Sequence, residues 1–131
     1  MTKARGSFEV TSWNEDPYEE LDGGGKLTRA SVEQTFDGDI AGDGAVQWLM
    51  SYRSDGTAHF VGLQRVKGSV GDRAGSFLLE TAGEFDGKEA NGSWSVIAGS
   101  GTADLEGLRG TGTFRAPHGS KASFELEYEF A

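Results

Sequence analysis

Apolar and polar residues alternate along most of this chain, and glycine-containing turns interrupt the alternation again and again. In the segment from Val46 to Tyr52, the side chains at every second position, including Trp48, are apolar. Asp-Gly pairs separate many such segments, and Asp-Gly supplies the positive φ angles that tight hairpin turns require. The pairs begin at Asp22, Asp37, Asp43, Asp55 and Asp86. The chain is therefore predicted to run as strand, turn, strand over most of its length.

Eight segments show this period of two residues, which gives a strand one buried face and one wet face. We predict strands over 5–15, 26–36, 45–53, 57–67, 73–83, 90–98, 110–116 and 123–130. An acidic, glycine-rich loop is expected over 15–25, and a hairpin turn over 37–43. Because Trp48 stands where a calcium loop has its bidentate glutamate, 37–43 is not expected to bind calcium.

Strands with one apolar face form either a two-layer sandwich or a sheet closed on itself. Closure removes both sheet edges, and eight strands leave an interior wide enough for side chains or one small ligand. The short, regular hairpins favour an all-β fold, an eight-stranded antiparallel up-and-down barrel. The alternation lapses between Gly99 and Gly110, where 102–106 predicts one helical turn, with Leu105 closing an end of the barrel.

Size and composition limit the possible classes. A chain of 131 residues is expected to form one domain over 1–131. The formal net charge of −9 argues against nucleic acid or an anionic membrane surface as partner. The absence of cysteine fits a cytoplasmic protein, and no segment resembles a signal peptide or a bilayer span. No nucleotide-binding or HExxH motif is present, so we expect no cofactor and no metal.

The inward phase of the strands combines many aromatic side chains with a few polar ones. Such a lining is typical of a small-molecule site, although the same side chains could simply fill the barrel. A buried amide without a partner costs about 1–3 kcal/mol, so Gln34 and Gln64 must bond each other, a water or a guest. The candidate ligand-binding residues are Gln34, Trp48, Tyr52, Phe60, Gln64, Arg73, Phe77, Trp94 and Tyr128.

Three charged residues have two interpretations each. Arg73 could hold a ligand carboxylate at the mouth of the barrel or pair with an acid such as Glu15 or Asp16. Glu15 and Asp16 could act in acid–base chemistry at the mouth, or lie in a solvated loop.

On the outward phase, four large apolar residues fall on three successive strands. Apolar side chains that gather outside a barrel suggest a subunit interface. We therefore expect a homo-oligomer formed through Leu49, Val61, Leu63 and Leu78.

The segment 101–110, which reads GTADLEGLRG, resembles the Gly-Ser/Thr-Gly signature of the allene oxide cyclase and dirigent barrels. Ala103 and Leu105 replace its second glycine and its aromatic residue. The whole chain resembles a bacterial family of uncharacterised proteins in the same superfamily, most closely over 26–32, 55–58 and 73–77. The resemblance implies an allene oxide cyclase-like barrel. Since Ser12 stands where the cyclases have a glutamate, it does not imply their reaction.

These features predict a protein that binds a small apolar molecule inside its barrel. The alternative is a cofactor-free cyclase or isomerase that holds a small lipophilic substrate in a folded shape. A carboxylate with a perturbed pKa, aimed into the cavity, would favour the enzyme. A filled barrel that serves only as an interaction surface is the third possibility.

Overall fold

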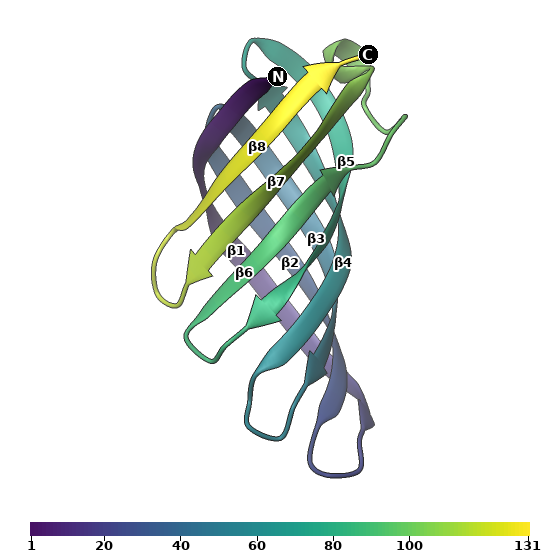
Figure 1. Cartoon of the computed structure of the whole chain (residues 1–131), viewed down its shortest axis with the longest axis vertical. Helices are drawn as coiled ribbons and strands as arrows, with labels where there is room; N and C mark the ends of the chain where they lie inside the picture. Colours follow the sequence, from purple (N-terminus) through teal and green to yellow (C-terminus); the bar gives the residue numbers. More distant parts are fainter.

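Eight antiparallel strands wind in chain order into a closed barrel in a computed structural model that describes all of residues 1–131 (Figure 1). The strands are β1 (Thr2–Glu20), β2 (Lys26–Gly38), β3 (Ile40–Tyr52), β4 (Ala58–Val70), β5 (Arg73–Phe85), β6 (Glu89–Val96), β7 (Leu108–Pro117) and β8 (Ala122–Phe130). Each strand pairs with its neighbours in the sequence, and β1 closes the ring against β8. The predicted eight-stranded up-and-down barrel is confirmed.

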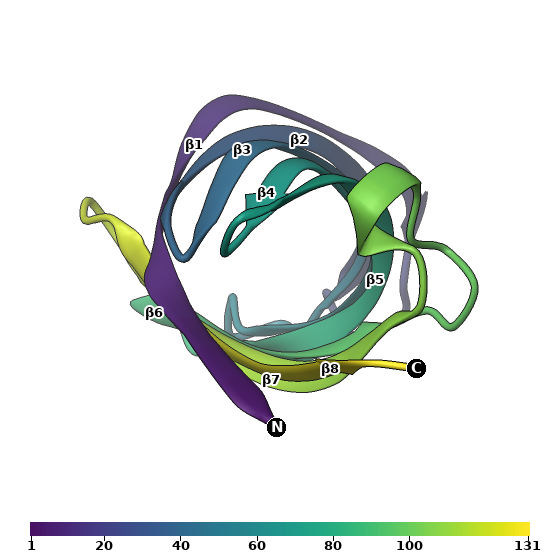
Figure 2. The same cartoon turned by 90° about the horizontal axis from the view of Figure 1, so that it is seen from above.

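The two ends of the barrel differ. The turns after β1, β3, β5 and β7 lie at one end, here called the hairpin end, staggered from the middle left to the bottom right of Figure 1. Both termini and the short helix η1 (Ala103–Leu105) lie at the other, the plugged end, which Figure 2 shows from above. Leu105 is fully buried there, so the predicted helical turn and its plugging role are confirmed. A membrane-crossing helix is absent, since η1 has only three residues.

Strand β1 is longer than predicted. The prediction of a loop over 15–25 is wrong, because β1 continues to Glu20 and the turn is confined to 21–25. Pairing with β2 survives through two register shifts, one between Val10 and Ser12 and one between Pro17 and Glu19. A bulge of this kind admits an extra residue or a proline without ending the strand.

The prediction of a turn over 37–43 is also wrong, because only Asp39 separates β2 from β3. The pair Asp43-Gly44 lies inside β3 and makes no turn. Gly44 serves packing: a Cβ there would lie 2.6 Å from the ring of Phe36 and 3.1 Å from Oε1 of Gln34.

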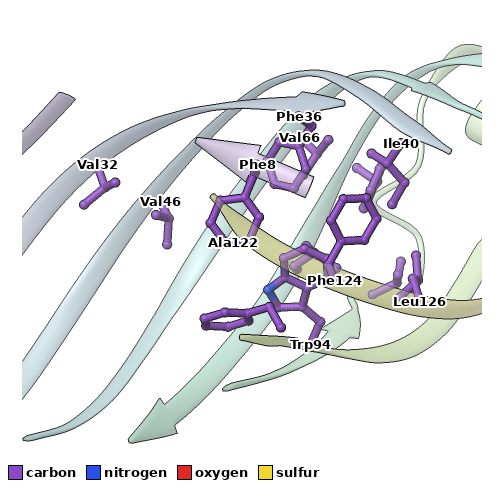
Figure 3. Close-up of a cluster of buried hydrophobic side chains, with 14 of the residues drawn as sticks. Phe8, Val32, Phe36, Ile40, Val46, Val66, Trp94, Ala122, Phe124 and Leu126 are labelled. Carbon is purple, nitrogen blue, oxygen red and sulfur yellow. The ribbon is translucent and has the colours of Figure 1, made fainter. Parts of the chain in front are cut away.

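Large side chains fill the barrel from its middle to the plugged end. Phe8, Phe36, Trp94 and Phe124 form an aromatic cluster in which the ring centroids of Phe8 and Phe36 lie 5.2 Å apart (Figure 3). The hydroxyl of Thr81 and the indole nitrogen of Trp94 have no hydrogen-bond partner within this filled part.

The wall of the barrel is incomplete beside β1. Strand β1 pairs with β8 only from Thr2 to Phe8, because β8 begins at Ala122. Over 9–20, β1 pairs with β2 alone, and its other edge is free. The hairpin end is therefore open sideways next to this free edge.

Candidate ligand-binding site

A cavity of about 160 Å³ lies inside the barrel toward the hairpin end. Its lining is apolar apart from one amide, that of Gln34. The lining residues are Phe8, Val10, Trp13, Gln34, Trp48, Met50, Tyr52, Phe60, Phe85, Ala90, Phe114 and Ala116. An apolar cavity of about 150 Å³ is large enough to hold benzene, whereas drug-sized ligands occupy about 300 Å³ or more. This cavity therefore fits one ring or a short branched chain.

Glycines on neighbouring strands make room for the aromatic wall. The rings of Trp48 and Phe60 meet edge to face with centroids 4.7 Å apart. A Cβ on Gly83 would lie 2.6 Å from the ring of Phe60, and one on Gly92 would lie 2.3 Å from the ring of Phe114. Because these positions carry no side chain, the rings can lie flat against the sheet.

The single polar group of the lining belongs to a buried pair. Gln64 Nε2 donates a hydrogen bond to Gln34 Oε1, and both side chains are buried. Of the three partners expected for these amides (each other, a water or a guest), the structure shows the first. Gln34 Nε2 has no partner in the protein, so it is free to donate to a guest in the cavity.

A carboxylate organises the rim of the cavity near the turn after β3. Glu15 accepts hydrogen bonds from Trp13 Nε1 at 3.0 Å, from the Thr28 hydroxyl at 2.6 Å and from the Tyr52 hydroxyl at 2.8 Å. Burial, followed by the bond to Glu15 and by its negative charge, raises the pKa of Tyr52 well above its ordinary value. Glu15 itself does not line the cavity.

A larger cleft of about 780 Å³ adjoins the cavity where the barrel wall is incomplete. The two share Phe8, Val10, Trp13, Phe85, Ala90 and Ala116. The turns after β5 and β7 border the cleft, and the backbone N–H of His118 ties them by donating to the carbonyl of Lys88 at 3.0 Å. The ionisable side chains that line the cleft are Glu9, Lys88, His118 and Lys121.

The structure brings some of the nine candidate residues together and separates the rest. Four line the cavity: Gln34, Trp48, Tyr52 and Phe60. Gln64 lies directly behind Gln34. Phe77 and Trp94 are buried in the packed core and do not border the cavity.

Arg73 and Tyr128 lie at the plugged end and not beside the cavity. The Arg73 guanidinium lies 4.0 Å from the centroid of the Phe130 ring, against which Tyr128 also packs. The expected pairing of Arg73 with Glu15 or Asp16 is not formed. The reason is topological: β5 begins at the plugged end, whereas β1 carries its acids toward the hairpin end.

Several lining residues were missed among the candidates. Alternation alone was a sufficient signal for Phe85, Ala90 and Ala116. Each lies an even number of residues from an inward-facing side chain of its own strand, namely Thr81, Trp94 and Phe114 respectively. Trp13 had no such signal. It lies an odd number of residues after Phe8, and it reaches the cavity only because the bulge after Val10 reverses the phase.

Comparison with known proteins gives a family and a matching structure. Residues 4–128 match a family described as "Protein of unknown function (DUF3224)". The chain is similar to the crystal structure of a protein with unknown function from the DUF3224 family from Shewanella oneidensis MR-1, at 27% identity and a TM-score of 0.82. That match covers 100% of this chain and 98% of the other. Among curated proteins, none matches this chain significantly.

Proposed function

We propose that this chain, which belongs to the DUF3224 family, binds a small, mainly apolar molecule in the cavity at the hairpin end of its barrel. The observation that carries the proposal is the cavity itself, an aromatic-walled space with one polar group, as small-molecule sites usually have. Its volume fits a single ring, and Gln34 Nε2 offers one hydrogen bond to a substituent. We place this binding in the cytoplasm, in keeping with a chain that lacks cysteine.

The arrangement of Glu15 favours binding over catalysis. A general base has to lie within about 2.6–3.2 Å of the proton that it removes. The Glu15 carboxylate is directed to Trp13, Thr28 and Tyr52, and it does not border the cavity. A carboxylate aimed into the cavity would favour a cyclase or isomerase, and no carboxylate lines this one, so ligand binding is the better-supported function.

An allene oxide cyclase-like origin for the barrel is part of the same proposal. Two features support it besides the closed ring of eight strands. Ala103, at the position of the second glycine of the signature, has a φ of +52°, in the left-handed region that glycine adopts most readily. Leu105, at the position of the aromatic residue, is fully buried.

Two matched substitutions on β7 test the proposal. Ala116→Leu adds bulk inside the cavity, whereas Thr113→Leu adds the same kind of bulk on the outer face. Toluene and benzyl alcohol are titrated into each protein while the fluorescence of Trp13 and Trp48, which line the cavity, is followed. We expect both probes to bind the unmodified protein and Thr113→Leu, and Ala116→Leu to bind at least about tenfold more weakly.

Native mass spectrometry of protein taken directly from its source gives a second readout. We expect a small organic molecule to accompany the protein. The proposal fails if nothing accompanies it and neither probe binds, or if Ala116→Leu binds the probes as tightly as the unmodified protein does.

A further inference from the structure

The cavity and the neighbouring cleft together point to the chemical class of the ligand. We infer that it is an amphipathic anion, with its apolar end in the cavity and its anionic group in the cleft beside Lys88 and Lys121. This inference rests on the proposed function, because it concerns the part of the same ligand that extends out of the barrel.

The two spaces form one continuous site. They share six lining residues, which lie on β1, β5, β6 and β7. Their common border lies at the free edge of β1, where Val10 is 50% exposed and Trp13 is 47% exposed. Large apolar side chains that are half exposed at the border of a cavity give an apolar ligand a path into it. A ligand longer than one ring therefore extends from the cavity into the cleft.

The charges along this path are unequally distributed. No charged residue lines the cavity, so a charged group of the ligand has to remain in the cleft. Lys88 and Lys121 line the cleft together with a single acid, Glu9. Lys121 lies 3.7 Å from Glu9 in an exposed ion pair, which contributes little, while Lys88 forms no ion pair.

The acids next to Lys88 in the sequence are already engaged. Asp86 accepts hydrogen bonds from the backbone N–H groups of Lys88 and Glu89, both at 2.8 Å. Glu89 pairs with Arg115 at 2.7 Å. The same backbone bonds lower the pKa of Asp86, and the nearby Lys88 charge adds to this effect. Lys88 forms no ion pair with Asp86, so its ammonium group can still contact a ligand, and its turn is held in place by the bond from His118.

The overall charge of the protein does not oppose this assignment at short range. The chain carries a formal net charge of −9, which repels anions at a distance. At physiological ionic strength, charges more than about 8 Å apart are largely screened from each other. Lys88 and Lys121 line the cleft, so they act on a group bound there within that distance.

A pair of probes that differ only in charge tests the inference. 4-Phenylbutyrate and 4-phenylbutanol have the same ring and chain, but only the first is an anion. Their affinities are measured by calorimetry at low salt for the unmodified protein, for the double variant Lys88→Gln/Lys121→Gln and for Lys67→Gln. Lys67 is the matched control, because it is exposed on the outer face of β4, away from the cavity and the cleft.

We expect the unmodified protein and Lys67→Gln to bind the acid about fivefold more tightly than the alcohol, the scale of one exposed charge contact. In the double variant the acid and the alcohol should bind equally, and added salt should reduce the preference in the unmodified protein. Unchanged binding of the alcohol shows that each variant is folded.

The outcomes separate the two proposals. Equal affinities of the unmodified protein for acid and alcohol would overturn the inference and leave the proposed function standing. A preference for the acid that persists in the double variant would overturn the assignment to Lys88 and Lys121. If neither probe binds, the proposed function fails and the inference fails with it.

Discussion

At the scale of single residues, Tyr52 links the apolar cavity to the polar rim. Its ring lines the cavity, while its hydroxyl donates to Glu15 at 2.8 Å. The same carboxylate accepts a hydrogen bond from Trp13, so Glu15 joins two aromatic side chains of the lining that come from β1 and β3. The shape of this part of the cavity therefore depends on a group outside it.

The raised pKa of Tyr52 predicts how stability changes in alkaline solution. In the unfolded chain this phenol ionises near its ordinary pKa of 10.0, whereas in the folded protein it keeps its proton to higher pH. Its contribution to the free energy of unfolding is complete below pH 10 and falls as the pH rises above that value. The free energy of unfolding measured in urea should therefore fall more steeply above pH 10 for the unmodified protein than for Tyr52→Phe.

The comparison isolates Tyr52 because every other titrating group is common to both proteins. Parallel pH profiles for the two proteins, measured from pH 8 to 11, would contradict the proposed role of its bond to Glu15.

At the scale of the strands and turns, glycine serves two purposes that the sequence does not distinguish. Gly56, in the turn after β3, has a φ of +89°, and a Cβ added to it would have no other atom within 4 Å. Gly44, inside β3, has an extended backbone and is crowded by Phe36. Both follow an aspartate, so the same dipeptide marks a turn in one place and a close side-chain contact in the other.

Alanine at these two positions should destabilise the protein for different reasons. Gly56→Ala is expected to cost about 1 kcal/mol through backbone strain and to leave toluene binding unchanged. Gly44→Ala is expected to cost about 1–3 kcal/mol through overpacking, and to weaken binding because it displaces Gln34. Denaturant unfolding and probe titration measure the two effects. A Gly44→Ala protein as stable as the unmodified one would refute the packing role.

The number of strands, and the facing of most side chains, could be predicted because every strand alternates over much of its length, as β3 does at Trp48 and Tyr52. The exception is Trp13, which follows the first bulge of β1. The length of β1 could not be predicted, because nothing in the composition of the segment indicates the two bulges that let the strand continue. The separation of Arg73 from the cavity was predictable from topology alone: successive turns of an up-and-down barrel alternate between its ends. The volume of the cavity depends on how Trp48, Phe60 and Phe114 pack, which alternation does not specify.

At the scale of the whole molecule, the outer face of β3, β4 and β5 carries an apolar patch. The patch consists of four side chains that are 40–60% exposed: Leu49, Val61, Leu63 and Leu78. Leu49 on β3 lies directly across from Val61 on β4. Arg65 and Glu80 flank the patch with opposite charges, and neither forms an ion pair. A patch bordered by both signs of charge can pair with a copy of itself about a two-fold axis.

We propose that the protein forms a homo-oligomer through this patch, and that Leu63→Glu dissociates it. Light scattering should give a mass above the 13.9 kDa of one chain for the unmodified protein, and the single-chain mass for Leu63→Glu. The association would bury the glutamate charge at position 63 among apolar side chains without a partner, and the free-energy cost of that burial accounts for the expected dissociation. Unmodified protein that remains at 13.9 kDa at high concentration would refute the proposal.

Both ends of the chain leave the barrel at the plugged end, where the Ala131 backbone N–H donates to the carbonyl of Gly107 at 2.9 Å. An affinity tag or a linker fused at either terminus would consequently emerge on the side away from Trp13, Lys88 and Lys121. Protein anchored to a sensor chip by such a linker would hold its binding site toward the flowing solution. Immobilised libraries of variants can thus be screened for ligands without steric interference from the anchor.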